Sequence, residues 1–139
     1  MTALTLDAAP AYALEIRTSD AGSPHRARHW LAWLLEIGRV AQDVIDTAVL
    51  AASELVTNAA VHAGGRVMVS AQVTDAGVRL VVHDDAPATD WHQPEGGLAE
   101  HGRGLVIVEA LAGGELDITA GPCGTTVTAL IPIPKEAAL

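Results

Sequence analysis

A single long helical pattern, from Asp43 to Ala63, most constrains how this chain of 139 residues can fold. Asp43 is suited to cap its start, and Gly64-Gly65 is a strong stop signal. Apolar residues recur along it at steps of three and four, which gives the predicted helix one core face. The residues of this face are Ile45, Ala48, Ala52, Leu55, Val56, Ala59 and Ala63.

Three polar side chains share another face of this helix. Glu54, Asn58 and His62 follow one another at intervals of four residues, so they span only about 80° of the helix circumference. One helix therefore aligns a carboxylate, a carboxamide and an imidazole. Periodicity alone leaves the purpose of this face open, because a solvated polar face has the same spacing.

The residues before the long helix predict one strand and one further helix. Tyr12, Leu14 and Ile16 alternate with smaller or charged residues over residues 12–17, which indicates a strand. Ser23 is suited to cap a helix whose first position is Pro24, and Gly38 is expected to end it. The predicted buried stripe of this helix consists of Ala27, Trp30, Leu31, Leu34 and Leu35.

Four strands and one helix are predicted after the long helix. Residues 67–74 alternate, and the turn Asp75-Ala-Gly77 leads into a second run, Val78–His83, which indicates an antiparallel hairpin. One helix and two strands are expected to follow, over Leu105–Ala112, Glu115–Ala120 and Thr125–Ile131. This order favours an α/β fold of the α+β two-layer sandwich type, with helices on one face of a mixed, mostly antiparallel sheet.

Residues 86–101 show no periodicity. A loop of this length in a compact domain is typical of a lid or binding loop, although a tolerated insertion is the alternative. Gly102-Arg-Gly104 follows where a helix begins, so backbone N–H groups could approach a phosphate there; an ordinary turn into the helix is equally consistent. Asp84-Asp85 precedes the loop, and a fixed carboxylate there could accept a hydrogen bond from an amino group such as that of adenine. A simple turn also explains this pair.

Charge and composition exclude several classes of function. A net charge of −9, from 17 acidic and 8 basic residues, argues against duplex nucleic acid as a partner. No apolar run approaches the ~20 residues of a membrane span. The first residues lack the basic segment of a signal peptide, so we expect a cytoplasmic protein. The single cysteine, Cys123, is expected to be an ordinary thiol in a turn.

Several common catalytic motifs are also missing. Gly102-Arg-Gly104 is not a P-loop, since no Lys-Ser or Lys-Thr pair follows at the required spacing. A metal centre is disfavoured because no Cys-x-x-Cys pair occurs and because His92 and His101 fall in or beside the non-periodic stretch. A hydrolase triad is disfavoured because no Gly-x-Ser-x-Gly segment occurs.

Taken in chain order, four motifs resemble those of a known superfamily. They are Glu54-Leu-Val-Thr-Asn58-Ala-Ala-Val-His62, Asp84-Asp85-Ala86, Gly102-Arg-Gly104-Leu105 and Gly124-Thr-Thr126. The set is similar to the N, G1, G2 and G3 boxes of the GHKL-type (Bergerat-fold) ATPases, and most similar to small bacterial anti-sigma factor serine/threonine kinases. The resemblance implies one histidine-kinase-like ATPase domain of Bergerat-type fold over residues 11–132, with tails at residues 1–10 and 133–139.

The resemblance also implies a role for each motif. Asn58 would coordinate Mg²⁺ at the nucleotide phosphates, Glu54 would be the catalytic general base, and Asp84 would accept the adenine amino group. Residues 86–101 would form the ATP lid. The remaining implied nucleotide contacts are Ala86, Gly102, Arg103, Gly104, Leu105 and Thr126. His62 matches a position that is commonly His and could be structural.

Two functions are consistent with the sequence. The resemblance implies a kinase that uses ATP and Mg²⁺ to phosphorylate a small anti-sigma antagonist and that binds a sigma factor; a homodimer without nucleic-acid or membrane contacts is expected. The alternative is a non-catalytic, partner-binding module of the same fold with weak or no ATP binding. Ala86 favours it, because the G1 box normally carries Gly there. A third interpretation is an α/β domain with a long surface loop and neither of these functions. It would require that three motifs occur in this order by coincidence.

Overall fold

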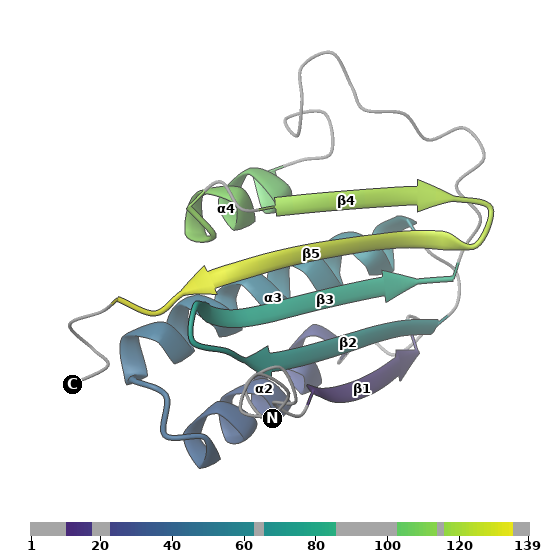
Figure 1. Cartoon of the computed structure of the whole chain (residues 1–139). Helices are drawn as coiled ribbons and strands as arrows, with labels where there is room; N and C mark the ends of the chain where they lie inside the picture. Colours follow the sequence, from purple (N-terminus) through teal and green to yellow (C-terminus); the bar gives the residue numbers. More distant parts are fainter. Residues whose placement is uncertain (1–10, 18–22, 63–65, 86–102, 114–115, 135–139) are drawn as a thin grey trace, which may run out of the picture.

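The computed structural model describes residues 11–17, 23–62, 66–85, 103–113 and 116–134. Figure 1 shows a single sheet with helices behind it. The elements in chain order are β1 (Ala11–Arg17), α2 (Ser23–Ile37), α3 (Gln42–His62), β2 (Arg66–Val73), β3 (Gly77–Asp84), α4 (Arg103–Leu111), β4 (Leu116–Gly121) and β5 (Gly124–Pro132).

The five strands form one sheet in the order β1-β2-β3-β5-β4. All four pairings between these strands are antiparallel. The predicted β2–β3 hairpin is present, and β4 and β5 form a second hairpin. After β3 the chain forms α4, enters the sheet again at its far edge as β4, and returns as β5 between β4 and β3. This topology places the C-terminal end of β3 directly beside the start of β5.

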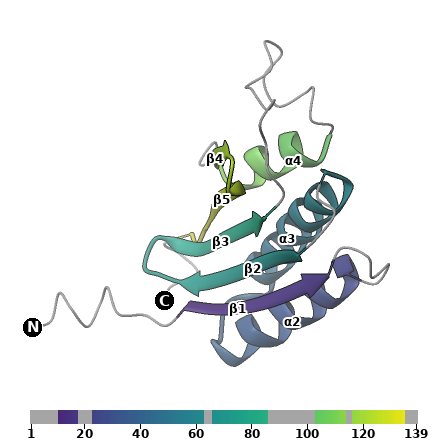
Figure 2. The same cartoon turned by 90° about the vertical axis from the view of Figure 1, so that its right-hand side faces the viewer.

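The helices cover one face of the sheet, as Figure 2 shows from the side. The middle helix, α3, packs against α2, α4 and the sheet. Six of the seven residues predicted for its core face are buried, and the seventh, Ala63, lies outside the described residues. The largest fully buried side chains come from both layers, so the predicted two-layer α/β sandwich is confirmed; they are Leu31, Leu35, Leu55, Leu80, Ile131, Val56, Val67, Val69, Val78 and Val108.

Helix boundaries differ from the prediction by one or two residues. Helix α3 begins at Gln42, so Asp43 lies in its first turn and is not the N-cap. The Gln42 side chain donates a hydrogen bond to Asp46 (Nε2 to Oδ1, 2.8 Å), and the carboxylate of Asp43 still stabilises the positive end of the helix. Helix α4 begins at Arg103, two residues before the predicted start.

The C-terminal end of α2 contains a residue in a left-handed conformation. The helix ends at Ile37, next to the predicted stop Gly38, but the positive φ of 59° belongs to Arg39. The N–H of Val40 donates to the carbonyl of Leu35 at 3.1 Å, which is the six-to-one hydrogen bond of a Schellman motif. An arginine therefore occupies a position that usually favours glycine.

Candidate functional site

Glu54 and Asn58, two of the three polar residues aligned on α3, lie on the flank of this helix that faces α4. Thr47 identifies this flank, because it lines a cavity of about 330 Å³ together with Ala110 and Leu111 of α4. Glu54 and Asn58 follow Thr47 by about two and three helical turns, so they project from the same flank. Both side chains are half-buried. This part of the polar face is therefore partly enclosed by the fold and is not fully solvated.

The N-terminus of α4 lies at the level of Glu54. Helix α4 runs opposite to α3, so that its last turn is beside the first turns of α3 (Figure 1). Arg103 precedes Ala110 by seven residues, and Glu54 follows Thr47 by seven residues. At 1.5 Å per residue each step is about 10 Å along its helix axis, and because the helices run in opposite directions both steps lead toward the same end of the molecule. The first-turn N–H groups of a helix have no partners within it and carry a partial positive charge. Such an end attracts phosphate groups.

Asp84 and Asp85 have different surroundings. Asp84 ends β3 on its helix-covered face and is 7% exposed. Asp85 is exposed, and its Oδ2 lies 3.7 Å from Nε of Arg66, whose Nη1 lies 3.5 Å from Oε1 of Glu15. These ion pairs are solvated and contribute little to stability. Asp84 is thus the carboxylate that lies on the same face of the sheet as α3.

The start of β5 adds a residue beside Asp84. In the β3–β5 register Thr125 is opposite Asp84, and directly opposed residues of antiparallel strands project from the same face. Thr126 is opposite His83, and its Oγ1 is joined to His83 Nδ1 by a hydrogen bond of 2.7 Å on the other face. The structure therefore brings Thr125, not Thr126, to the face of Glu54, Asn58 and Asp84. The alternation that places Thr125 in phase with buried Val127 was the signal for this residue.

Gly124 allows the close approach of β5 to β3 at this point. Its φ is +117°, and a Cβ at this position would collide with the backbone carbonyl oxygen of Asp84. Only glycine fits such a contact without displacing the strand end.

The elements that carry the described site residues converge toward one end of the molecule. The last turns of α3, the end of β3 and the start of β5 all lie at the right-hand side of Figure 1. A carboxamide oxygen such as that of Asn58 is a suitable Mg²⁺ ligand, a carboxylate such as Glu54 can accept a proton, and a buried carboxylate such as Asp84 is suited to accept a hydrogen bond from an amino group. Ala86 and Gly102 lie outside the described residues, as do the side chains of His62, Arg103 and Leu105.

One histidine pair was missed in the sequence analysis. His25 and His29 have the His-x-x-x-His spacing on α2, and their ring centroids are 4.2 Å apart at an interplanar angle of 75°. Arg28 Nη2 lies 3.4 Å from Nδ1 of His25, and such a cation opposes binding of a metal cation there. The described residues contain no group of three or more His, Cys, Asp or Glu side chains arranged for a metal.

A comparison with models of protein families matches residues 17–131 to the histidine kinase-like ATPase domain. The chain belongs to this family. The match extends from the last residue of β1 nearly to the end of β5, so it includes every element that forms the site. The histidine kinase-like ATPase domain implies ATP binding, and membership confirms the GHKL-type resemblance. A search of curated proteins found no match to the chain.

Two further expectations from the sequence concern membrane-spanning helices and the single cysteine. In the described part of the chain, no helix combines the length and the apolar character that crossing a membrane requires. Cys123 is exposed in the turn between β4 and β5, as predicted.

Proposed function

We propose that this histidine kinase-like ATPase domain is an anti-sigma-type regulator with serine/threonine protein kinase activity. It binds ATP with Mg²⁺, phosphorylates a small antagonist protein, and binds a sigma factor in the alternative complex. We expect the protein to be cytoplasmic and to form a homodimer. Its main support is the α3 flank, where half-buried Glu54 and Asn58 face α4 at the level of the α4 N-terminus.

Each described side chain has one role in this proposal. Asp84 accepts a hydrogen bond from the adenine amino group, and Thr125 offers a hydroxyl on the same face. Asn58 would hold Mg²⁺ through its amide oxygen, and the ion would neutralise charge on the phosphates. Glu54 accepts the proton of the attacking Ser or Thr hydroxyl, whose oxygen bonds to the γ-phosphorus as the bond to ADP breaks. The N-terminus of α4 supplies further positive potential.

A second candidate function is regulation by contact alone, with weak or no ATP binding. Ala86 favours it, because the resemblance implies glycine at this position, where an added methyl group would weaken binding of the base. Arg103 is the single Lys or Arg between Asp84 and Gly104, so little positive charge is available from this segment to stabilise phosphoryl transfer.

Calorimetric titration with ATP, with and without Mg²⁺, tests the nucleotide part of the proposal. Proteins that copurify with the chain are then incubated with it and γ-labelled ATP. We expect Mg²⁺-dependent binding and label on a Ser or Thr of a small partner protein. Glu54→Gln should bind ATP normally and transfer no label. A chain that binds its partner but takes up no ATP at millimolar concentration would overturn the kinase and support the second candidate.

A further inference from the structure

Two exposed apolar side chains occupy the same level on α3 and α4. Leu50 of α3 is 45% exposed and Ile107 of α4 is 37% exposed. Thr47 and Ala110 mark one level of the two helices, because both line the cavity between them. Leu50 follows Thr47 by three residues and Ile107 precedes Ala110 by three, so in these antiparallel helices the two apolar side chains are also level. Neighbouring exposed apolar side chains are a feature of interaction sites.

This apolar pair lies between the cavity and Glu54, the proposed general base. Steps of three and four residues along α3 place on one stripe of the helix Asp43, Thr47, Leu50 and Glu54. Ile107 shares a side of α4 with the cavity-lining residues Ala110 and Leu111, which follow it by three and four residues. We call the four residues of the α3 stripe together with Ile107 the α3–α4 strip. It leads from the cavity at one end to Glu54 at the other.

The cavity at the start of the strip has the size of a small binding site and accepts hydrogen bonds. Its volume is about 330 Å³, and the buried side chains of Val44 and Ile131 belong to its lining. Asp43 is the one charged residue among the described residues that line it. The hydroxyl of Thr47 already donates to the backbone carbonyl of Asp43 at 2.9 Å, so its oxygen is left to accept from a ligand. An ammonium or guanidinium group, which only donates, fits these acceptors.

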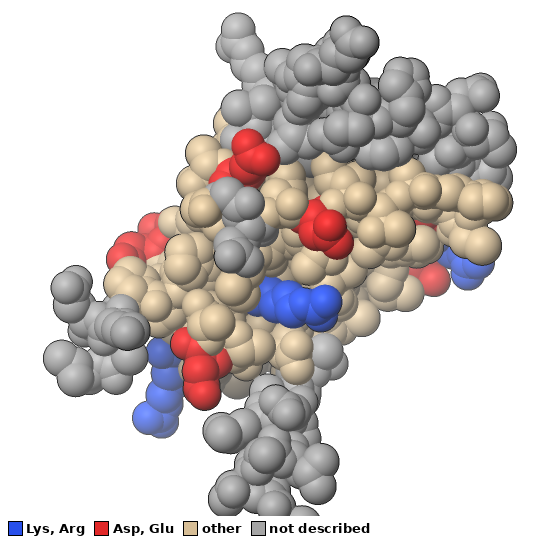
Figure 3. Space-filling model, turned by 45° about the horizontal axis from the view of Figure 1, so that its top comes forward, with Lys and Arg blue, Asp and Glu red and all other residues tan. Residues whose placement is uncertain are grey.

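Negative charge prevails around this cavity. The last turn of α4 has the partial negative charge of a helix C-terminus and contains no basic residue. Asp46 and Glu109, each next to a lining residue in sequence, are exposed. The positive end of α3 is offset by Asp43 in its first turn, and the nearest basic residue in sequence to this end of α3 is Arg39, in the connection from α2. The whole chain has a net charge of −9, and on the face in Figure 3 its basic side chains lie apart from one another.

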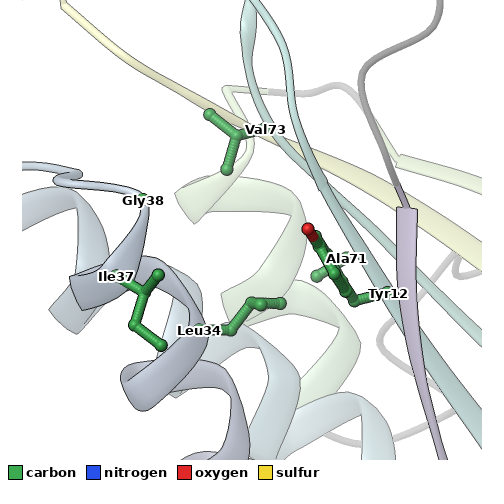
Figure 4. Close-up of a pocket in the computed structure, with 6 residues that line it drawn as sticks. All are labelled: Tyr12, Leu34, Ile37, Gly38, Ala71 and Val73. Atoms are coloured by element: carbon green, nitrogen blue, oxygen red, sulfur yellow. The ribbon is translucent and has the colours of Figure 1, made fainter.

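A smaller pocket lies at the β1 edge of the sheet. Figure 4 shows it between the end of α2 and the first two strands, and its volume is about 200 Å³. None of the described residues that line it is charged, so it has no group that selects one occupant over another. It also lies away from Glu54, whereas the α3–α4 strip ends there.

We propose that the α3–α4 strip docks the segment of the protein substrate that contains the phosphorylated Ser or Thr, an inference that rests on the proposed kinase function. The segment binds in an extended form, because the half-buried carboxylate of Glu54 is accessible to a single chain and not to a flat protein surface. Its hydroxyl lies at Glu54, an apolar side chain contacts Leu50 and Ile107, and a Lys or Arg enters the cavity beside Asp43. The net charge of −9 favours a basic segment.

The length of the strip sets the spacing of these substrate residues. Leu50 precedes Glu54 by four residues and Asp43 precedes it by eleven, which at 1.5 Å per residue are rises of about 6 Å and about 16 Å. An extended chain covers these lengths in about two and about five residues. The substrate segment therefore carries its apolar residue about two positions and its basic residue about five positions from the Ser or Thr, on the same side of it.

Fluorescence anisotropy with labelled peptides and the full chain tests this docking without requiring catalysis. Two peptides carry Leu two residues and Lys five residues from a single Ser, before it in one peptide and after it in the other; scrambled peptides of the same composition are the reference. We expect one of the two to bind at least about fivefold more tightly than its scrambled form, and less tightly at high salt. Leu50→Ser and Ile107→Ser should each raise the dissociation constant at least about fivefold. The control Met68→Ser, which changes an exposed apolar residue of β2, should leave it unchanged.

Asp43→Asn tests the cavity separately. The unaltered protein should prefer the Lys peptide to one with Gln in place of Lys, and Asp43→Asn should abolish this preference. Asp117→Asn, which changes an exposed carboxylate of β4, should retain it. Lys135 follows the cavity-lining Pro134 in sequence and is a competing cation of the same chain. A preference for Lys that is seen only with Lys135→Ala would assign the cavity to the chain's own C-terminal segment and overturn the proposal.

Three other results would also overturn it. The patterned peptides could bind no better than the scrambled ones, or could bind the Leu50 and Ile107 variants normally. Self-association that Leu50→Ser abolishes, without peptide binding, would assign the strip to a second copy of the chain. Titration of the Leu50→Ser and Ile107→Ser variants with ATP and Mg²⁺ reports on the nucleotide site separately. A chain that takes up ATP but binds no patterned peptide retains the proposed function and loses the docking strip, and uptake of peptide without ATP has the opposite meaning.

Discussion

Thr125 lies directly across from Asp84 in the register of β5 and β3, on the face covered by the helices. The neighbouring Thr126 pairs with His83 and is hydrogen-bonded to it on the other face, at 2.7 Å. Two adjacent threonines of one motif therefore belong to different surfaces of the sheet. The pair provides a matched test of which surface binds nucleotide.

Thr125→Val should weaken ATP binding, whereas Thr126→Val should not. Valine keeps the shape of threonine but removes its hydroxyl, and one hydrogen bond contributes about 0.5–1.5 kcal/mol, or a few-fold in affinity. Thr126→Val loses the bond to His83 and should cost a similar amount of folding stability. Calorimetry with ATP and chemical denaturation measure the two effects. Loss of ATP affinity in Thr126→Val alone would place the nucleotide on the open face.

Gly124→Ala should destabilise the protein by more than about 2 kcal/mol. The added Cβ would meet the carbonyl oxygen of Asp84, and the φ of +117° is unfavourable for any L side chain. Gly121→Ala is the control in the same hairpin, because nothing lies within 4 Å of a Cβ there. It should change the free energy of unfolding by less than about 0.5 kcal/mol. Equal effects of the two substitutions in urea denaturation would contradict the close approach of β5 to β3.

Much of this architecture could be predicted from the sequence. Alternation located the β2–β3 hairpin, and the three- and four-residue repeat of α3 identified its core face, because burial of one face dictates these periods. The β3–β5 pairing could not be predicted, since it joins segments separated by α4 and β4. For the same reason the position of Thr125 beside Asp84 could not be predicted: alternation places Thr125 in phase with buried Val127, but its pairing partner depends on the register between distant strands.

Asn58→Ala should remove the Mg²⁺-dependent part of ATP affinity and leave the fold intact. The side chain is half-buried on the α4-facing flank and outside the apolar core, so its loss creates no core cavity. We expect the affinity for ATP·Mg²⁺ to fall by more than roughly tenfold, since even outer-shell partners of a metal contribute that much. Titrations with and without Mg²⁺ should then agree.

The neighbouring residue offers a control for Asn58. Thr57 is exposed, and its hydroxyl donates to the carbonyl of Ser53 at 2.7 Å, so Thr57→Ala changes α3 without touching the α4-facing flank. Its ATP·Mg²⁺ affinity should equal that of the unaltered protein. An Asn58→Ala variant that still responds to Mg²⁺ in the same way would remove the metal role from this residue.

Arg39→Gly should stabilise the protein by about 1 kcal/mol, because a left-handed residue with a side chain costs roughly 1–2 kcal/mol and glycine avoids most of this cost. Part of the gain is lost to the greater freedom of glycine in the unfolded chain. The hydrogen bond from Val40 to Leu35 that closes the end of α2 involves backbone atoms alone and is retained. Arg79→Gly, which removes an exposed arginine from β3, is the control and should destabilise by roughly 0.5–1 kcal/mol. Thermal denaturation distinguishes the two, and a lower melting temperature for Arg39→Gly would mean that the arginine side chain stabilises the fold by more than its backbone conformation costs.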